Sequence, residues 1–387
     1  MQVITSEKIP IKIWADKVEE GTVEQAKHLA NLPFAYRHVA LMPDTHEGYG
    51  MPIGGVLATD GVVIPNAVGV DIGCGMRVIK TDIKYPTQEL LQKIVSDIKE
   101  DIPVGFNWNE EPLSIIGLCP SFKDSPDLPV IHQEYNKACY QIGTLGGGNH
   151  FIEIQTDGQY MWVMLHSGSR NVGLQVANHY NKIASALNEK WFSKVPKEWQ
   201  LAFLPLDSEE GQSYINEMQW CVDFAELNRQ MMLYFIEQII KKWYPDVTFS
   251  SEIDIAHNYA AIENHFGHNV IVHRKGATRA RVDEYGIIPG SMGTKSYIVK
   301  GLGNPESFMS CSHGAGRAMG RKVAQRELSL KKEMEMLNNQ GIIHDMNSQS
   351  KLDEAPSAYK DISEVMKNQE DLVEIVHELS PLAVIKG

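Results

Sequence analysis

Several histidines in short glycine-rich motifs are the residues of this sequence that could do chemistry. His150 ends the run Gly-Gly-Gly-Asn-His, His166 opens His-Ser-Gly-Ser-Arg, and His313 lies in Ser-Cys-Ser-His-Gly-Ala-Gly-Arg. Glycines beside a functional side chain let the backbone approach a ligand closely. Loops on a rigid scaffold often hold binding and catalytic groups. A single such histidine is usually a satisfied core or surface residue, but several of them indicate a shared site.

Asp71 and Cys74 could add a carboxylate and a thiolate to these histidines. The motif Asp-Ile-Gly-Cys separates them by two residues, so a turn could point both side chains at one centre. A metal ion would hold the thiolate deprotonated, and histidines would complete the coordination. Cys74 alone would more often be a small buried hydrophobe. Cysteine with histidine favours zinc, whereas the carboxylate also suits manganese.

Two glycine-rich segments could bind phosphate. Residues 143–148, Gly-Thr-Leu-Gly-Gly-Gly, could cradle phosphates through backbone N–H groups, although they match neither the P-loop nor the dinucleotide-binding fingerprint. The small residues after His313 lead into a predicted helix whose N-terminus would favour an anion. Arg170, Arg317 and Arg321 could grip phosphates bidentately.

The elements that must position these residues are a mixture of strands and helices. Short apolar runs between Gly and Pro predict strands over about the first 80 residues, at about 150–155 and 161–166, and at the chain end. Apolar spacing predicts the helices 87–100, 129–141, 173–193, 209–243, 314–337 and 357–370. Asp207 and Ser208 offer an N-cap to the long helix, and 103–128 is expected to be a loop. No regular βαβ alternation is visible, so a Rossmann or TIM layout is not expected.

Composition is that of an ordinary soluble globular protein, with 43% hydrophobic and 22% charged residues. The 5 cysteines are scattered, which argues against a disulfide framework and for a reducing cytoplasm. No apolar run approaches the roughly 20 residues of a membrane span, and the N-terminus lacks a signal-peptide pattern.

The formal net charge of −13 counts against general nucleic-acid binding. Positive charge is nevertheless clustered in two places, and an acidic protein can still carry one basic groove. The alternative is that both clusters are solvated faces. The clusters consist of Arg274, Lys275, Arg279 and Arg281, and of Arg317, Arg321 and Lys322.

Together the motifs resemble those of one family, the RtcB RNA-splicing and repair ligases. They follow the family order from about residue 42 to the last residue. The resemblance implies a mixed α+β fold, with one RtcB-type domain over residues 1–387, β-sheets surrounded by helices and a metal site in a central cleft. The matching segments are MPDTHEGYG (42–50), VGVDIGCGMR (68–77), GTLGGGNHFIEI (143–154), HSGSR (166–170), HNYA (257–260), HRKGATRA (273–280), PGSMGTKSYI (289–298), SCSHGAGR (310–317), DEAPSAYKDI (353–362) and the terminal Lys386-Gly387.

The resemblance further implies two adjacent manganese ions bridged by one thiolate, and so favours manganese over zinc. Asp71, Cys74 and His150 would hold one ion. Cys74, His166 and His257 would hold the other.

His313 would be the nucleophile that attacks the α-phosphorus of GTP and becomes guanylylated. Asp44, in the MPDTH motif, would orient its imidazole and stabilise its charge. The alternative for Asp44 is a turn aspartate after Pro43.

The same motifs imply a guanylate pocket. Glu153 would read the two donors on the guanine edge, Tyr359 would stack on the base, and Lys386 would reach the guanine. The pocket residues implied by the resemblance are Asn149, Phe151, Glu153, Ser291, Ser296, Ala315, Gly316, Tyr359 and Lys386.

The implied reaction joins RNA ends in tRNA splicing or RNA repair. A 2′,3′-cyclic phosphate is opened to a 3′-phosphate by metal-activated water, GMP moves from His313 to that phosphate, and a 5′-hydroxyl attacks as GMP leaves. Some relatives use a protein cofactor of the archease kind, which this sequence does not indicate.

The sequence departs from the family pattern in three places. Gly320 stands where a serine is expected, which weakens any claim about contacts there. The segments 103–128 and 195–215 match less well and could set substrate choice.

Two other function classes compete with a ligase. A two-metal cyclic phosphodiesterase or phosphatase would not use GTP, and the His313 motif with Glu153 and Lys386 argues against it. A non-catalytic RNA-binding module is opposed by the complete ligand sets and the acidic balance. A GTP-dependent covalent adduct would separate the ligase from the hydrolase.

Overall fold

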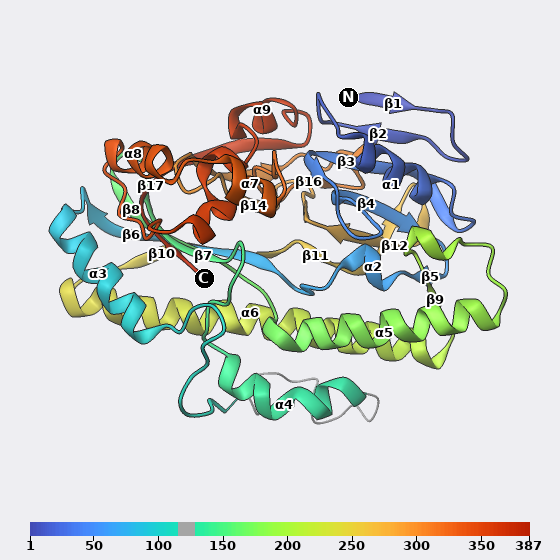
Figure 1. The fold of residues 1–387 in the computed structure, drawn as a ribbon, viewed down its shortest axis with the longest axis horizontal. Helices are drawn as coiled ribbons and strands as arrows, with labels where there is room; N and C mark the ends of the chain where they lie inside the picture. The colour runs from blue at the N-terminus through green and yellow to red at the C-terminus, as the bar shows by residue number, and fades with distance from the viewer. Residues whose placement is uncertain (115–127) are drawn as a thin grey trace.

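The computed structural model describes residues 1–114 and 128–387. Within them, strands and helices follow one another in mixed order, which confirms the predicted α+β class (Figure 1). The predicted loop 103–128 lies partly outside the described residues. Its described part, 103–114, contains an isolated bridge from Val104 to Gly146 and no helix or longer strand after α3 ends at Asp101.

The first sheet has six strands in the order β1-β2-β3-β4-β12-β11. Its neighbours are antiparallel except for the β2–β3 pair. Asp44 lies near the end of β3, and β11 begins directly after His257. The strands are β1 (Gln2–Ile4), β2 (Ile11–Ile13), β3 (Ala35–His46), β4 (Ile53–Thr59), β12 (His268–Lys275) and β11 (Asn258–His265).

The second sheet has seven antiparallel strands in the order β10-β6-β8-β7-β17-β15-β14. In its register, Gly75 at the start of β6 faces Ser167 at the end of β8, and Phe151 at the start of β7 faces His166. The residues just before β6 and β7 and at the end of β8 therefore meet at one end of the sheet. The strands are β10 (Phe249–Ala256), β6 (Gly75–Lys84), β8 (Tyr160–Ser167), β7 (Phe151–Thr156), β17 (Val373–Lys386), β15 (Ser296–Gly301) and β14 (Tyr285–Ile288).

Two short ribbons complete the strands. One pairs β13 (Ala277–Arg279) with β16 (Ser310–Ser312), and this ribbon leads directly into His313. The other pairs β5 (Val62–Val63) with β9 (Leu204–Pro205).

Two long helices, α5 (Arg170–Lys190) and α6 (Glu209–Trp243), pack side by side beneath the sheets (Figure 1). Ser208 caps α6, since its Oγ accepts a hydrogen bond from the Gly211 amide at 3.1 Å. In the described part of the chain, no helix is both long and apolar enough to cross a bilayer. The remaining helices are α1 (Glu20–Ala30), α2 (Pro65–Val68), α3 (Gln88–Asp101), α4 (Pro129–Gln141), α7 (Arg321–Glu327), α8 (Leu330–Asn339) and α9 (Ile362–Lys367).

Helix α6 contributes to two cores, which explains its long buried face. Near its start, Trp220 and Phe224 pack in one cluster with Tyr180 of α5. Near its end, Ile236 packs in a second cluster with Ile94 of α3 and apolar residues of the second sheet. Burial on this scale holds α6 rigidly against the end of the sheet where the site lies.

The prediction of one helix over 314–337 is wrong. The chain after His313 stays irregular until α7 begins at Arg321, and an extended Leu328–Ser329 pair separates α7 from α8. Gly316 has φ +72°, and a Cβ there would lie 2.2 Å from the Asp44 carbonyl oxygen, so this backbone cannot be helical. His313 therefore does not lie at a helix N-terminus, because the helix that follows it begins only at Arg321. The predicted helix 357–370 is likewise reduced to α9.

Candidate active site

Five predicted metal ligands meet where β6 and β7 begin and β8 ends, beside the start of β11. The Cys74 Sγ atom lies 3.1 Å from His166 Nε2 and 3.5 Å from His150 Nε2. His166 Nε2 lies 3.3 Å from His257 Nε2, and His150 Nε2 lies 3.1 Å from an Asp71 carboxylate oxygen. Four of these side chains are buried, and Asp71 is 33% exposed. The structure thus brings residues that are up to 186 positions apart in the chain into one cluster.

The cluster divides into two sets that could each hold a metal ion, and Cys74 belongs to both. In each set the candidate ligand atoms lie within 4.8 Å of one another. Sulfur, imidazole nitrogen and carboxylate oxygen are donors that suit a transition metal. The sets are Asp71, Cys74 and His150, and Cys74, His166 and His257.

Burial favours the neutral form of two imidazoles of this cluster, those of His166 and His257. It places the pKa of His166 well below its usual value, and the neighbouring His150 adds to the effect. It does the same to the pKa of His257, with a further contribution from His313. A neutral imidazole is the form that binds a metal.

The pKa values of the two acidic members of the cluster, Cys74 and Asp71, are shifted in opposite directions. Burial and the nearby Asp71 charge hold the pKa of the Cys74 thiol well above its usual value. Burial opposes ionisation of Asp71 as well, but the hydrogen bond and charge of His150 outweigh it, and the pKa of Asp71 falls to about 2. A cation would therefore have to displace a proton from Cys74 but not from Asp71.

Backbone contacts fix how two of the ligands are presented. His166 Nδ1 lies 3.2 Å from the Asn149 carbonyl oxygen, so Nδ1 carries the proton and Nε2 is left to bind a metal. Asn258 donates from Nδ2 to the Asp71 carbonyl at 3.0 Å and accepts from the Gly276 amide at 2.7 Å. These bonds tie the Asp71 turn to the segment that follows His257.

Two adjacent residues of α6 clamp the ligand loops from below. Asn228 accepts from the Gly143 amide at 2.7 Å and donates to the Ser167 hydroxyl at 3.1 Å. Arg229 donates to the carbonyl oxygens of Gly73 at 3.0 Å and Ser167 at 3.1 Å, and its guanidinium is neutralised by Asp254. Both side chains are buried. They hold the backbone beside Cys74 and His166 in place.

Asp44 holds the His313 segment through hydrogen bonds to one of its carboxylate oxygens. One Asp44 carboxylate oxygen accepts from His313 Nδ1 at 2.6 Å, from the His313 amide at 3.1 Å and from the Gly314 amide at 3.2 Å. Burial raises the pKa of Asp44, but the charge and hydrogen bond of His313 outweigh it and the net pKa is lowered. With Nδ1 engaged, Nε2 is the nitrogen left free to react. The His313 ring lies 4.9 Å from that of His257, beside the metal cluster.

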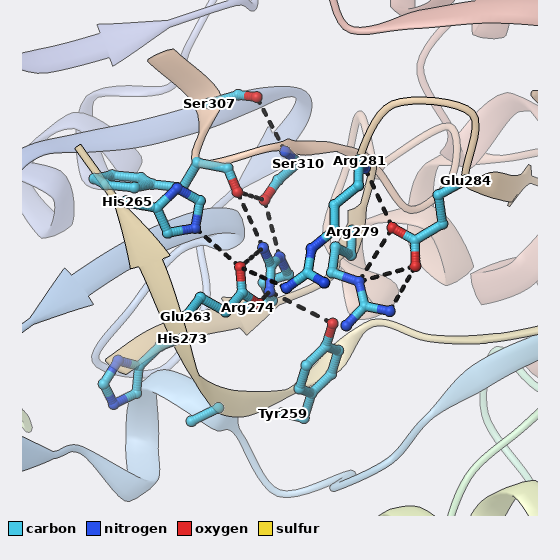
Figure 2. A network of polar contacts seen from close by, with 12 residues as sticks. Tyr259, Glu263, His265, His273, Arg274, Arg279, Arg281, Glu284, Ser307 and Ser310 are labelled. Carbon is cyan, nitrogen blue, oxygen red and sulfur yellow. Dashed lines mark hydrogen bonds and ion pairs between the residues drawn. The ribbon is translucent and has the colours of Figure 1, made fainter. Parts of the chain in front are cut away.

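A buried ion pair supports the strand that leads into His313 (Figure 2). Arg274 and Glu263 are paired across neighbouring strands and lie at 0% and 2% side-chain exposure. Arg274 Nε donates to the Ser310 hydroxyl at 2.9 Å, and Nη2 donates to the Phe308 carbonyl at 3.0 Å. His265 Nε2 contacts the same Glu263 carboxylate at 2.9 Å. This network fixes β16 at Ser310, three residues before His313.

The first basic cluster is therefore not one open groove. Arg274 is buried in the ion pair, and Lys275 is buried with its ammonium on the carbonyl oxygens of Tyr49 and Asn66 at 2.6 and 3.1 Å. Arg279 pairs with Glu284 at 2.5 Å, as Figure 2 shows. Only Arg281 is mostly uncompensated, since its closest carboxylate lies 3.9 Å away.

A cavity of about 190 Å³ opens beside His313. Ser296 does not line it: its hydroxyl is buried behind the wall, where it accepts from Gln155 at 3.0 Å and from the Gly290 amide at 3.2 Å. A larger cavity of about 530 Å³, with Tyr49 and Phe192 in its wall, contains none of the metal ligands. The predicted guanylate residues that do line the cavity beside His313 are Asn149, Phe151, Glu153, Ser291, Ala315, Gly316, Tyr359 and Lys386.

Charged groups in this cavity are coupled through Glu354. Its carboxylate accepts from the Tyr359 hydroxyl and pairs with Arg317 at 3.2 Å and with Lys386 at 3.4 Å. The Arg317 guanidinium lies 5.3 Å from the centre of the Tyr359 ring and covers one of its faces. Burial raises the pKa of Glu153 to about 7, although Lys386 opposes the shift.

The three predicted phosphate-binding arginines lie in different places. Arg317 and Arg321 line the cavity, and Arg321 also pairs with Asp353 at 3.5 Å. Arg170 lies on the other side of the glycine-rich loop, where it donates to the Thr144 hydroxyl at 3.0 Å and pairs with no carboxylate of the described residues. A Cβ at Gly146 would lie 1.7 Å from the Arg170 guanidinium, so only glycine fits there.

Sequence reasoning missed four kinds of residue. His46 lines the cavity and belongs to the same MPDTHEG motif as Asp44, so the motif could have indicated it. Glu354 lies in the DEAPSAY motif and could have been found in the same way. Asn228, Arg229 and Glu263 are buried polar residues outside the motifs. Arg274 was named only as part of a basic cluster, and its buried ion pair with Glu263 was not predicted.

The chain matches the family described as tRNA-splicing ligase RtcB over residues 25–125 and 119–387. It is 37% identical, over 411 aligned residues, to the RNA-splicing ligase RtcB of Escherichia coli (strain K12), covering 100% of this chain and 99% of the relative. It is 32% identical, over 461 aligned residues, to the tRNA-splicing ligase RtcB of Thermococcus kodakarensis, covering 98% of this chain and 95% of the relative.

Proposed function

The chain belongs to the tRNA-splicing ligase RtcB family, and on that premise we propose that it is a GTP-dependent RNA ligase with a histidine nucleophile. Its substrates are RNA ends that carry a 3′-phosphate or a 2′,3′-cyclic phosphate and ends that carry a 5′-hydroxyl. The reaction serves RNA repair or tRNA splicing. Residues 1–387 act as one domain, and the scattered free cysteines support a reducing cytoplasm as its setting.

We assign two manganese ions to this site on the strength of the family resemblance, because cysteine and histidine ligands alone would favour zinc. Asp71, Cys74 and His150 would hold one, and Cys74, His166 and His257 would hold the other. When bound, the ions would supply Lewis-acid stabilisation of charge on the transferring phosphoryl group. The converging lone pairs of a buried thiol and two neutral imidazoles, with no cation of the described chain between them, support this assignment.

The observation that carries the proposal is the hydrogen bond between the Asp44 carboxylate and His313 Nδ1. The 2.6 Å contact at Nδ1 fixes the tautomer and leaves the Nε2 lone pair free to attack the α-phosphorus of GTP. A nitrogen–phosphorus bond forms as the bond to pyrophosphate breaks. The imidazolium charge that develops is stabilised by the Asp44 carboxylate.

The second half of the reaction returns His313 to its starting state. An oxygen of the RNA 3′-phosphate attacks the phosphorus bound to His313, and the nitrogen–phosphorus bond breaks. The 5′-hydroxyl of the other RNA end then attacks the activated 3′-phosphate and GMP leaves. A 2′,3′-cyclic phosphate is opened to the 3′-phosphate before these steps.

The cavity residues would select the guanine base. An ionised Glu153 can accept from two donors on one guanine edge, and Lys386 can donate to an acceptor of the base. Because Arg317 covers one face of Tyr359, the other face is the one available for stacking. Ser291, Asn149 and the backbone at Ala315 and Gly316 would bind the ribose and phosphate. Ser296 would act indirectly, by holding Gln155 beside Glu153.

The test is incubation of the full chain with α-labelled GTP and manganese, followed by denaturation and measurement of label on the protein. We expect an acid-labile adduct that is absent in His313→Ala and present in His268→Ala, which removes a half-exposed histidine at the start of β12 that does not line the cavity. No adduct in the wild-type protein with manganese bound would reject the ligase and favour a two-metal cyclic phosphodiesterase or phosphatase.

A further inference from the structure

Two aromatic side chains are exposed in the segment that follows α3. Phe106 is 100% exposed and Trp108 is 44% exposed. Neither ring has a stacking or edge contact with another ring of the described chain. A large apolar side chain left wholly in water commonly marks a binding surface when other features point to a ligand.

The position of these rings supplies the first such feature, because the segment is joined to the candidate site. The Gly105 amide donates to the Gly146 carbonyl at 3.0 Å, and Arg170 donates to the Gly105 carbonyl at 3.2 Å. A Cβ at Gly146 would in turn lie 2.8 Å from His150 Nδ1. Phe106 follows Gly105 directly, so it lies within about three Cα–Cα steps, or ~11 Å, of a candidate metal ligand. That distance corresponds to about three nucleotides of a stacked strand.

Charge is the second feature. Arg170 lies between the glycine-rich loop and Gly105, and it forms no direct ion pair with any carboxylate in residues 1–114 or 128–387. The Asp71 carboxylate acts on it only through its charge, so the guanidinium can still pair with an RNA phosphate. Beyond Trp108, the exposed Glu110 and Glu111 would repel the phosphate backbone. This arrangement favours a strand whose phosphate stays at Arg170 while a base reaches the aromatic rings.

The segment is also held in shape. The Asn109 amide donates to the Tyr140 carbonyl at 3.0 Å, and the Asn109 side chain donates to the Ile142 carbonyl at 2.7 Å. The Asn107 amide donates to the Val104 carbonyl at 3.2 Å and closes a turn with Phe106 at its tip. An anchored turn loses less conformational entropy on binding than a free loop would.

A protein partner fits these observations less well. A specific protein interface needs about 800 Å² from each side. Here the two rings stand among Asn107, Glu110 and Glu111, and no other residue of the described segment 103–114 is an exposed large hydrophobic.

We propose that Phe106 and Trp108 form a stacking platform for an unpaired base of the substrate RNA, within the first few nucleotides from the reacting end. The proposal rests on the proposed ligase function and adds a specificity element to it. Aromatic rings stack on any base, so the platform would select unpaired ends rather than a sequence. It also assigns a role to a segment that departs from the family pattern.

The test measures binding of a 5′-fluorescent RNA 10-mer with a 3′-phosphate to the full chain, by anisotropy, with manganese and without GTP. We expect the Kd to rise roughly 5- to 100-fold in Phe106→Ala, in the range of a lost base–aromatic stack. Phe106→Tyr should keep most of the affinity, because it keeps a ring. Phe192→Ala is the matched control: Phe192 is 91% exposed but lies beyond the far end of α5, roughly 30 Å from Arg170.

An abasic scan makes the test specific to stacking. Each of the last four nucleotides is replaced in turn by an abasic one, and binding to wild type and Phe106→Ala is compared as a double-mutant cycle. One abasic position should weaken binding to the wild type and have no further effect in the variant. Equal losses in both proteins at every position, or wild-type affinity in Phe106→Ala and Trp108→Ala, would overturn the platform and leave the rings as a contact for a protein.

GTP labelling of the wild-type chain, run in parallel, separates the two proposals. Failure to form the adduct rejects the ligase, whereas the abasic scan, which uses no GTP, still decides whether the aromatic rings bind a base.

Discussion

Two buried polar clusters lie on either side of the segment that carries His313, and they differ in how their charges are balanced. Behind it, the Arg274 guanidinium is paired with Glu263 and hydrogen-bonded to Ser310 and Phe308. In front of it, the Cys74 thiol and the Nε2 atoms of the ligand histidines face one another with no cation from the described residues.

The difference separates a structural cluster from a binding cluster. A buried ion pair with its hydrogen bonds made is complete, so it can hold a strand in place without a ligand. Converging lone pairs in a buried site are compensated only when a cation enters. One polar atom of the cluster behind His313 is unsatisfied: His265 Nδ1 has no hydrogen-bond partner among residues 1–114 and 128–387, although His265 Nε2 contacts Glu263.

Breaking the complete cluster should have the largest effect. Arg274→Met leaves the Glu263 carboxylate buried without its cation, and we expect the free energy of unfolding to fall by about 3–5 kcal/mol. Urea denaturation of the metal-free protein measures this. The double variant Arg274→Met with Glu263→Leu removes both charges and should recover a large part of the loss. A single variant as stable as the wild type would show that the pair does not support β16.

Cys74→Ala removes the thiol of the candidate metal cluster, and we expect it to lower metal affinity strongly while changing stability little. The free energy of unfolding without metal should change little, because the thiol makes no essential charged contact. Manganese affinity, measured by calorimetric titration, should fall by more than about 100-fold, beyond the effect of removing a residue that only orients a ligand. Cys221→Ala, which removes a buried cysteine of α6 outside the cluster, is the control. Unchanged affinity in Cys74→Ala would remove the thiol from both ligand sets.

The pH dependence of metal binding sharpens the same comparison. Because burial raises the pKa of Cys74 and lowers those of His166 and His257, one proton must leave when the metal binds at neutral pH. Affinity should therefore rise about tenfold per pH unit, or roughly 100-fold between pH 6.5 and 8.5. Titrations across this range, with proton release read from the buffer dependence of the enthalpy, measure the slope. A flat profile would mean that the thiol stays protonated or does not bind.

The sequence predicted the site better than the path that the backbone takes to it. The candidate metal ligands and His313 lie in motifs of small residues that have few alternatives, so their side chains could be named before their positions were known. The helix expected over 314–337 failed because the close approach of Gly316 to Asp44, far away in the chain, overrides local helical spacing. The buried contacts of Asn228, Arg229 and the Arg274–Glu263 pair could not be predicted, because a buried polar residue on a helix or strand has no local signature until its partners are known.

The charge of Glu153 is only partly balanced, so it lies between the Arg274–Glu263 cluster and the candidate metal cluster. Its variants should have the smallest effect. Its carboxylate is buried with one Gln155 hydrogen bond at 2.6 Å and the nearby Lys386 charge, and its pKa is raised to about 7. If the ionised form binds guanine, affinity for a guanine nucleotide should fall as the pH drops through 7, by roughly tenfold from pH 8 to pH 6. Glu153→Gln should bind weakly at both values and lose this dependence, which fluorescence titration with a labelled GTP analogue would show.

The same raised pKa affects folding without ligand, with a definite sign. The folded state holds the Glu153 proton more tightly than the unfolded state, so the wild-type protein should lose stability relative to Glu153→Gln as the pH rises from about 4.5 through 7. Nucleotide binding therefore favours the ionised form of the Glu153 carboxylate, whereas folding favours its protonated form. If pH changed the stability difference but not the nucleotide affinity, Glu153 would have only a structural role. Other residues of the cavity would then have to recognise the guanine edge.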